Sequence, residues 1–452
     1  MTFGSSNNIK KQSLFRQFCA VNRNPPKNPN PMFNKKHTDV CVIGAGPVGL
    51  VAAHALADSN VDFMQFDKVV GCHTHSYALA LLPETLELLD QLGVAERVLQ
   101  RARKVPRIAF YHGDERKAEL DYSKLKTSFP YLAVIKQGEL ESILLDTLKA
   151  KGHKPHWHHR VRYINEEEDH VVLEVDRLIE GMTGYAYAHI DMQIEKILQY
   201  RANYVIGADG HRSAARRVAG IAFNETAPVQ TYAVFEFKSD VELPDEMRII
   251  LDEQGSHIFW PMPDNYCRWS FAVNPEDAPV EAINKKDCLI YIGKNAYPLL
   301  DDAHIAGFIS KHAKWFKGSA DKISWRTLVH FQHRMAENFG RDRIWLAGDA
   351  AHLTAPGGML SMNVGMHEAY DLVQRLSLDS DELREAAIAS YSSDRIKEWS
   401  DLLCLDGALQ GDLADPWILE HKESLATNLP ATGDTRRALL EQVHLDAAAH
   451  TN

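Results

Sequence analysis

The chain has 452 residues, of which 45% are apolar and 25% are charged, values that are ordinary for a globular protein of two or three domains. Its formal net charge of -11 at pH 7 argues against a nucleic-acid partner, because such a partner requires clustered lysine and arginine. The six cysteines form no C-x-x-C pair, so we expect neither a zinc ribbon nor a dithiol centre, and we predict a reduced, cytoplasmic protein.

Residues 1–36 form a region of their own. They contain seven lysines and arginines and no acidic residue, and residues 24–31 are rich in proline and asparagine. Such a segment has little apolar surface to bury, so we predict a mobile basic extension. A transit peptide is the alternative, because the segment is basic and acid-free, although it has no clear amphipathic pattern.

A glycine-rich motif follows the first predicted strand, residues 40–43. The motif residues are Gly44, Gly46, Pro47 and Gly49. They open a predicted helix, and the next predicted strand, residues 61–66, ends at Asp67. The glycines allow a tight turn, close approach of a pyrophosphate and close packing of the helix, while an acid at this distance can bind ribose hydroxyls. The motif predicts dinucleotide binding but does not choose between NAD and FAD.

The same glycines and Pro47 interrupt the most apolar run of the chain, residues 40–57. We therefore expect a strand, a turn and a helix there, and no membrane span. His73 and His75 lie beyond it on a predicted loop, where a metal site is the less favoured alternative because no carboxylate or cysteine accompanies them.

The middle of the chain adds a helix from Gln137 to about residue 151 and a predicted hairpin of residues 157–164 and 171–175. The hairpin region is rich in histidine, with His153, His156, His158 and His159. We interpret these histidines as a solvated strand face, with a metal site as the alternative. We predict no metal ion.

A second nucleotide-type signal follows a strand that starts near residue 201. Asp209 and Gly210 end this strand, and a helix then begins with Ser213 and carries Arg216 one turn later. The carboxylate can accept a hydrogen bond from a hydroxyl of a cofactor, the glycine permits close approach, and the arginine can pair with a phosphate or a carboxylate.

Residues 226–335 change in character, with alternating patterns that predict several strands. We interpret this region as a sheet-rich substrate domain. Its aromatic side chains could form the wall of an apolar pocket. The candidate substrate contacts are Tyr232, Phe259, Trp260, Trp269 and Phe331.

The third signal is Gly348 and Asp349, which follow a predicted strand over residues 343–347. Ala351, His352 and Pro356 come next, and an apolar helix is predicted from about Asn363 to residue 376. A Gly-Asp pair alone has little meaning. It gains weight because it follows the two earlier motifs in the same chain.

In their order, the three motifs resemble those of the single-component FAD-dependent monooxygenases of the para-hydroxybenzoate hydroxylase type, over roughly residues 37–400. The resemblance implies an α/β fold with a Rossmann-like FAD-binding domain (37–225 and 336–400), an interleaved sheet-rich substrate domain (226–335) and a helical carboxyl-terminal tail (401–452). It implies that FAD contacts the following residues: Gly44, Gly46, Pro47, Gly49, Asp67, Gln137, Asp209, Gly210, Gly348, Asp349, Pro356, Gly358, Met362 and Asn363.

The resemblance also implies the reaction: NADH or NADPH reduces the flavin as a transient donor, O2 adds to give a C4a-hydroperoxyflavin, and the oxygen passes to an aromatic or polycyclic phenolic substrate. The flavin carries this chemistry, so we identify no catalytic side chain. We expect a monomer or a homodimer. The alternatives are an epoxidase, a Baeyer-Villiger-type enzyme, a halogenase, or a non-catalytic flavin-binding protein. The halogenase motif W-x-W-x-I-P is absent, since no two tryptophans are two residues apart.

The chain departs from the family pattern in two places. Tyr77 and Glu84 occupy positions where arginine is common, which removes the usual phosphate clamp. Met359, Leu360 and Ser361 occupy a loop that is usually rich in glycine, which predicts bulkier and more apolar surroundings for the flavin ring.

Overall fold

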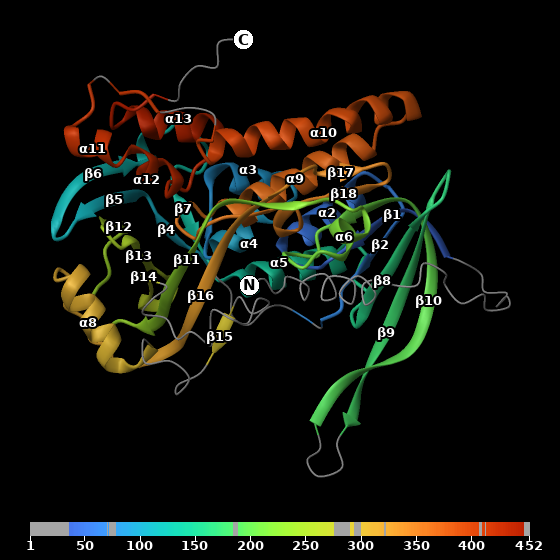
Figure 1. The fold of residues 1–452 in the computed structure, drawn as a ribbon, viewed down its shortest axis with the longest axis horizontal. Coiled ribbons are helices and arrows are strands. Elements are labelled where there is room, and N and C mark those ends of the chain that lie inside the picture. The colour runs from blue at the N-terminus through green and yellow to red at the C-terminus, as the bar shows by residue number, and fades with distance from the viewer. Residues whose placement is uncertain are drawn as a thin grey trace, which may run out of the picture. The chain divides into compact units, whose positions relative to one another are not determined.

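The computed structural model describes residues 36–69, 71, 78–183, 189–274, 290–292, 300–320, 322–405, 409–411 and 413–446. The predicted basic extension, apart from Lys36, and the histidines His73 and His75 lie outside the described residues. The described chain is an α/β protein with two large sheets, a small third sheet and a helical carboxyl-terminal region (Figure 1). The predicted fold class is confirmed.

The first sheet has seven strands and forms the core of the predicted FAD-binding domain. The strands are β1 (Lys36–Ile43), β2 (Phe63–Phe66), β8 (His159–Glu166), β9 (Val171–Thr183), β10 (His189–Gly207), β17 (Gly340–Arg341) and β18 (Ile344–Leu346). β1 pairs with β2 in parallel, and β10 pairs with β18 in parallel. Residues 40–43 are all buried, as an uninterrupted apolar strand predicts for a parallel sheet covered on both faces.

Helices pack around this sheet. They are α2 (Pro47–Asp58), α5 (Gln137–Ala150), α6 (Ala214–Val218) and α9 (Leu360–Leu376), and α2 packs against both α5 and α9. The third sheet is small and contains β3 (Ala80–Leu81), β4 (Arg103–Val105) and β7 (Leu132–Val134). Two helices, α3 (Pro83–Gln91) and α4 (Ala95–Leu99), come between β3 and β4 in the sequence.

The three predicted motifs meet at one edge of the first sheet. The N–H of Ala208, after β10, donates to the carbonyl of Ile43, the last residue of β1, at 2.8 Å. The N–H of Ala347, after β18, donates to the carbonyl of Gly207 at 3.0 Å. These two bonds place the ends of three strands side by side, which is where an α/β sheet binds its ligand.

The second sheet has nine strands. They are β5 (Arg107–His112), β6 (Glu115–Asp121), β11 (Phe223–Lys238), β12 (Glu246–Asp252), β13 (Gly255–Pro261), β14 (Tyr266–Val273), β15 (Ile290–Ile292), β16 (Ile323–Ala336) and β19 (His352–Leu353). β5 and β6 come from the segment that we assigned to the FAD-binding domain, yet β5 pairs with β12 in parallel. The sheet-rich lobe therefore includes residues far outside 226–335, because strand pairing joins segments that are distant in the sequence.

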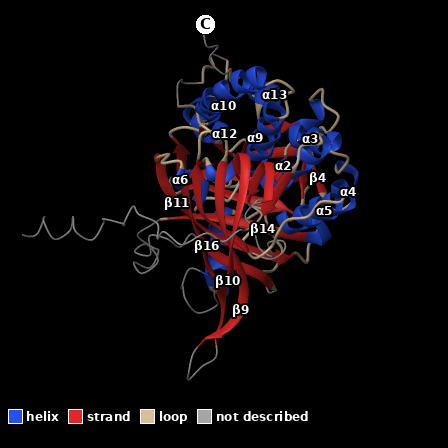
Figure 2. Ribbon diagram, turned by 90° about the vertical axis from the view of Figure 1, so that its right-hand side faces the viewer, coloured by secondary structure: helices blue, strands red, loops and turns tan. Residues whose placement is uncertain are grey.

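Both faces of this second sheet are buried. Side chains alternate along a strand, so Phe259 and Trp260, neighbours in β13, face opposite ways. Phe259 packs in a cluster with residues of α8 (Asp302–His312), whereas Trp260 packs in a cluster with residues 409–445 of the carboxyl-terminal region. Figure 2 shows α10, α12 and α13 gathered on one side of the strands.

The carboxyl-terminal region contains α10 (Asp381–Leu402), α11 (Pro416–Glu420), α12 (Lys422–Thr427) and α13 (Gly433–Glu441). It does not form a separate unit, because its apolar side chains complete the core over β5 and β6. The Tyr122 hydroxyl also donates to the carbonyl of Pro430 at 2.6 Å. No helix among the described residues is both long and apolar enough to cross a bilayer.

The predicted hairpin of β8 and β9 is present, but β9 also pairs with β10 over a much longer ladder (Figure 1). β10 starts at His189, twelve residues before the predicted start near residue 201. Apolar side chains of this extension are partly exposed, with Met192 at 39%, Ile194 at 43% and Ile197 at 51%. The alternation of apolar and polar residues over 190–194 was the available sequence signal for this strand.

Candidate functional site

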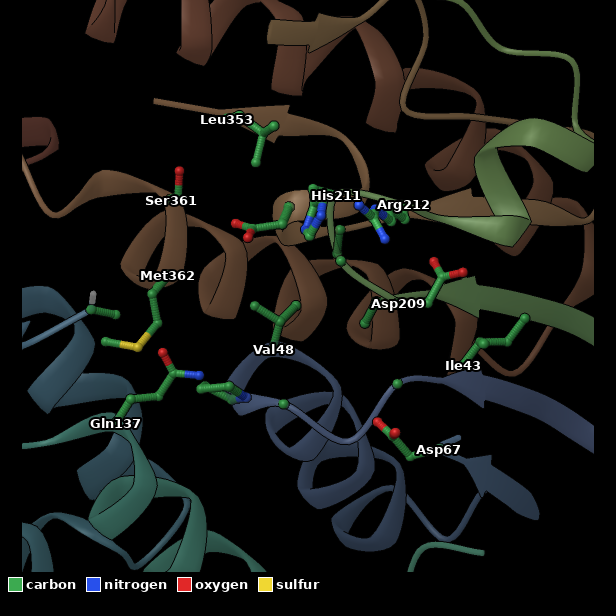
Figure 3. A pocket seen from close by; sticks show the side chains of 18 of the residues that line it. Ile43, Val48, Asp67, Gln137, Asp209, His211, Arg212, Leu353, Ser361 and Met362 are labelled. Atoms are coloured by element: carbon green, nitrogen blue, oxygen red, sulfur yellow. The ribbon is translucent and has the colours of Figure 1, made fainter. Parts of the chain in front are cut away.

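A cavity of about 560 Å³ opens at the edge where the three motifs meet (Figure 3). Ten of the predicted cofactor residues line it: Gly44, Gly46, Pro47, Asp67, Gln137, Asp209, Gly210, Asp349, Pro356 and Met362. Four do not: Gly49, Gly348, Gly358 and Asn363. The four outside the lining lie against other parts of the protein instead.

The first turn owes its shape to its glycines. Gly44 has a φ of +108°, and a Cβ atom there would lie under 3.0 Å from the backbone of Ala208. A Cβ at Gly49 would meet the carbonyl of Gly44 in the same way. At Gly46, by contrast, no atom lies within 4 Å of a Cβ, because this residue faces the cavity. Gly46 therefore leaves room for a ligand, whereas the other two glycines leave room for the protein itself.

Asp67 fixes this turn from the end of β2. Its Oδ2 accepts a hydrogen bond from the N–H of Ala45 at 2.7 Å, and its Oδ1 accepts one from the N–H of Val69 at 2.8 Å. Gln65 adds a bond to the carbonyl of Gly44 at 2.9 Å, a role that the sequence did not suggest. Asp67 is thus engaged by the backbone and also borders the cavity.

Asp209, which follows β10, also binds the backbone and borders the cavity. Its Oδ2 accepts hydrogen bonds from the N–H groups of Ala214 and Ala215 at 2.5 and 3.4 Å. Burial raises the pKa of this carboxyl group, and hydrogen bonds from Ser213 and the backbone oppose the shift. The side chain closes the turn into α6 and presents its remaining surface to the cavity.

Arg216 has a different role from the one that we predicted. Its guanidinium donates to the carbonyl of Ala350 at 2.6 Å and to that of His211 at 2.9 Å, and it lies over the Phe223 ring at 3.8 Å. The side chain is 7% exposed and does not line the cavity. It joins the second and third motifs instead of reaching toward a phosphate or a carboxylate.

The third turn, Gly348–Ala350, lies against α9. A Cβ at Gly365 of α9 would lie under 3.0 Å from the Cα of Gly348, so the helix and the turn are in direct backbone contact. Burial raises the pKa of the Asp349 carboxyl group in the cavity; His352 opposes the shift and Glu368 adds to it. Among the described residues, Asp349 has no hydrogen-bond donor to its carboxylate, unlike Asp67 and Asp209. A ligand hydroxyl can therefore occupy this position.

Asn363 supports the same region from outside the cavity. Its Nδ2 donates to the carbonyls of Ala80 at 2.9 Å and Met359 at 2.7 Å, and its Oδ1 accepts from the N–H of Leu82 at 3.1 Å. Met359, at the start of α9, has a φ of +50°, which is uncommon for a residue with a side chain. Asn363 therefore holds the loop that borders the cavity in an unusual backbone conformation.

Glu368 is a buried carboxylate that the sequence analysis missed. Its Oε2 accepts hydrogen bonds from the N–H of Gly348 at 2.8 Å and from Nε2 of His352 at 2.9 Å, while Oε1 accepts one from Trp399 Nε1 at 2.7 Å. Burial raises its pKa, but His352 and the three donors outweigh burial, so the net shift is downward. Its spacing of four residues from buried Val364 and Leu372 was the available signal.

Replacing Glu368 with glutamine should destabilise the fold. An amide oxygen can accept on one side only, so one of the three donors would face an NH2 group. We expect the free energy of unfolding to fall by about 2–4 kcal/mol, measured by urea denaturation. Adding Trp399→Phe removes one donor and should restore part of the loss. A Glu368→Gln variant as stable as the parent would show that the three bonds do not hold the turn.

His211 gives the site a pH dependence. Burial, followed by the charges of Arg212, Lys68 and Arg216, lowers its pKa from 6.5 to about 4. The unfolded chain takes up this proton at a higher pH than the folded chain, so stability is retained above pH 6.5 and falls as the pH drops toward 4. His211 is partly exposed, which reduces the effect. We therefore expect His211→Asn to raise the free energy of unfolding by about 1 kcal/mol near pH 4, measured by thermal unfolding of the apoprotein. Equal pH profiles for both proteins would contradict this assignment.

Four of the five predicted substrate contacts lie in the core. Tyr232, Phe259, Trp260 and Trp269 are at most 1% exposed, and none lines the cavity. Aromatic strands in a sheet with two covered faces bury their rings on either face, which explains why composition misled here. Phe331 is the exception, because it lines the cavity together with its neighbours in β16.

One group among the described residues has the spacing of a metal site. The ligand atoms of Asp252, His257 and His312 lie within 4.8 Å of one another. However, Nδ1 of His257 accepts a hydrogen bond from the N–H of Ala272 at 3.1 Å, so Nε2 carries the proton and donates to Asp252 at 3.0 Å. Nδ1 of His312 lies 2.9 Å from the same carboxylate oxygen. Hydrogen bonds account for this cluster and leave no nitrogen of His257 for a metal.

Comparison with known proteins gives a family match over most of the chain. The model of the FAD binding domain matches residues 37–404. The chain is 27% identical to 6-methylpretetramide 4-monooxygenase of Streptomyces rimosus, over 80% of this chain and 60% of that protein. It is 25% identical to para-nitrophenol 4-monooxygenase of Pseudomonas sp. (strain WBC-3), over 79% of this chain and 82% of that protein.

Solved structures share the fold. The p-nitrophenol 4-monooxygenase of Pseudomonas putida DLL-E4 superposes with a TM-score of 0.66 at 21% identity, over 91% of this chain and 99% of that one. Aklavinone-11 hydroxylase with FAD and aklavinone gives a TM-score of 0.59 at 20% identity, over 82% and 66% of the two chains. This chain spans about three fifths of the length of some curated relatives that it matches, namely 60% and 61% of two of them.

Proposed function

Because the chain belongs to the family defined by this FAD-binding domain, we propose that it is an FAD-dependent monooxygenase that hydroxylates an aromatic or polycyclic phenolic compound. The proposal rests on one observation: three nucleotide-type turns, at Gly44, Asp209 and Asp349, border a single cavity. Two of the acids are engaged by backbone N–H groups, whereas the Asp349 carboxylate has no donor among the described residues. That arrangement suits a large cofactor with hydroxyl groups and a diphosphate.

The residues present fit FAD. We propose that Gly46 and the amino end of α2 receive the diphosphate, since a helix N-terminus favours an anion and Gly46 leaves space for one. Asp67 would accept from a ribose hydroxyl and Asp349 from a hydroxyl of the ribityl chain. Gln137 and Met362 both line the cavity (Figure 3) and would lie along the ring system.

When bound, FAD would supply the redox and oxygen chemistry, with electrons from NADH or NADPH and with O2 as co-substrate. The protein's part is to orient the substrate and to exclude water from the ring. Leu353, Met359 and Leu360 line the cavity without a charge. Together with Phe331 they form an apolar wall at which an aromatic substrate would lie.

The names of relatives support the substrate class without identifying the substrate. They include a 6-methylpretetramide 4-monooxygenase and a para-nitrophenol 4-monooxygenase, and the chain is about equally similar to both. We therefore propose a phenolic ring and no particular compound. The uncharged residues 359–362, at the start of α9, agree with an uncharged aromatic system.

Purification followed by turnover assays tests the proposal. The protein should emerge yellow with FAD bound, and a matching phenol should accelerate the oxidation of NADH or NADPH and appear as a hydroxylated product. Hydrogen peroxide should be measured in parallel, because uncoupled oxidation makes peroxide without product. A protein that takes up no FAD would refute the cofactor assignment, whereas bound FAD with no stimulation by any phenol would favour a non-catalytic flavoprotein.

A further inference from the structure

Strands β8, β9 and β10 form an antiparallel arm in which β9 lies between the other two. β9 and β10 extend beyond the body of the described chain (Figure 1, Figure 2). One side of the arm joins the core of the first sheet through Val161, Leu173 and Val175. Side chains alternate along a strand, so the neighbours of Val175 face the opposite side, which we call the arm face. On β9 its residues are Glu174, Asp176, Leu178 and Glu180.

A β-bulge in β10 aligns apolar side chains on the arm face. The ladder pairs Asp176 with Ile197, Leu178 with Ile194 and Glu180 with Met192. Ile194 and Ile197 are three positions apart, a spacing that would turn them to opposite faces of a regular strand. The register shifts by one residue between Ile194 and Lys196, which brings Ile197 back to the arm face. Met192, Ile194 and Ile197 therefore form one row along β10.

A second bulge, in β8, adds Tyr163 to the arm face. The register shifts between Val161 and Tyr163, so that Tyr163 pairs with Glu174. Tyr163, Ile194 and Ile197 are 61%, 43% and 51% exposed, so the rest of the described chain covers them only in part. Bulges re-aim side chains, and contiguous exposed apolar side chains mark a surface for association.

The arm face carries opposite charges on either side of Leu178. The buried Asp176 carboxylate binds Arg160 at 2.8 Å and Arg162 at 3.0 Å, so two guanidinium groups share one carboxylate and leave one positive charge in excess. Glu180 is exposed, and its carboxylate forms no ion pair with any residue that the structure describes. Leu178 lies midway between Asp176 and Glu180 on β9. A two-fold rotation about an axis through Leu178 therefore places the excess positive charge of one copy against Glu180 of another.

We propose that two copies of the chain associate through the arm face, stacked face to face about a two-fold axis at Leu178. Ile194 packs near Leu178 and Ile194 of the second copy, and Glu180 pairs with the excess arginine charge. An anionic bilayer is a poorer occupant, because it requires an excess of cations, whereas Glu174 and Glu180 lie on either side of the arginines. The inference does not depend on the proposed function, since no cofactor takes part in the contact.

The size of the arm face sets the expected strength of the association. β9 has 13 residues. At about 3.3 Å per residue and about 4.8 Å between strands, the three-stranded face covers roughly 400–600 Å² in each copy. A total of about 1,000 Å² is at the lower limit of a specific interface, so we expect a dimer with a Kd in the micromolar range.

Sedimentation of the full chain over a range of micromolar concentrations tests the inference. The parent protein should change from monomer to dimer as its concentration rises. Ile194→Lys should raise the Kd at least about thirtyfold, because two like charges meet near the axis, and Glu180→Lys should raise it about tenfold. Ile179→Lys is the matched control: Ile179 is also 43% exposed, but it lies on the opposite side of the arm, so its replacement should leave the Kd unchanged. Thermal unfolding measures whether each variant is folded, and if Ile194→Lys is not, Glu180→Lys decides.

A parent protein that stays monomeric at every concentration would overturn the inference. A dimer that Ile194→Lys and Glu180→Lys leave intact would place the interface elsewhere and also overturn it. Equal weakening by Ile194→Lys and Ile179→Lys would show that the arm face is not the surface in contact. A monomer that cosediments with vesicles of phosphatidylcholine and phosphatidylserine would assign the arm to a membrane surface, against the inference.

Discussion

Asp349→Ala should lose FAD while the apoprotein keeps its stability. The Asp349 carboxylate lines the cavity, its pKa is raised by burial, and it has no donor among the described residues. Its removal therefore breaks no hydrogen bond of the empty protein and relieves a desolvated charge. A hydrogen bond to a charged acceptor is worth about 1.5–3 kcal/mol, so FAD affinity should fall about 10- to 100-fold.

The measurement compares FAD content after gel filtration with the thermal unfolding of the apoprotein. Asp67→Ala is the matched control. It removes the hydrogen bond from the N–H of Ala45 in the first turn and the one from the N–H of Val69, so it should lower both FAD content and apoprotein stability. Full FAD retention by Asp349→Ala would remove Asp349 from the cofactor site.

Valine substitutions at Gly46 and Gly44 should differ in their effect on the stability of the empty protein. At Gly46 a Cβ atom meets no atom within 4 Å, so Gly46→Val should leave apoprotein stability unchanged and exclude the diphosphate by bulk. At Gly44 the backbone has a φ of +108° and a Cβ would overlap Ala208, so Gly44→Val should cost about 3 kcal/mol or more. Thermal unfolding and FAD content of both variants measure the difference. Normal FAD content in Gly46→Val would contradict the proposed cradle.

The three turns could be predicted from the sequence because each combines a buried strand with a glycine at a fixed distance. Gly44 and Gly348 have positive φ angles, and such positions restrict the residue type strongly enough to be recognised locally. The predicted order of strand, turn and helix around Gly44, Asp209 and Asp349 agrees with the structure. Local chemistry was sufficient because the strand and the turn of each signal are adjacent in the sequence.

The supporting contacts could not be predicted, since they join distant parts of the chain. Arg216 binds the carbonyl of Ala350, 134 positions away, and Asn363 binds the backbone of Ala80 and Leu82, more than 280 positions away. Their residue types suggested phosphate or cofactor contacts, but the structure uses them to hold one motif against another. Only the assembled fold shows which polar side chains face the cavity and which face the protein.

The aromatic residues of the second sheet illustrate a further limit. Phe259 and Trp260 are adjacent, and periodicity correctly implies opposite faces, but the sequence does not reveal that both faces are covered. The cover comes from α8 on one side and from residues 409–445 on the other. A strand that would have one solvated face in a smaller sheet is therefore buried on both faces. This explains why four of the five proposed substrate contacts lie in the core.

The most direct test of the account uses labelled dioxygen. The FAD-loaded protein is incubated with NADPH, a phenol that stimulates its oxidation and 18O2, and the product is examined by mass spectrometry. We expect a hydroxylated ring that carries one oxygen atom from 18O2 and none from water. A product labelled only from H218O, or NADPH oxidation that yields hydrogen peroxide alone with every stimulating phenol, would contradict the proposal that this cavity supports a monooxygenase.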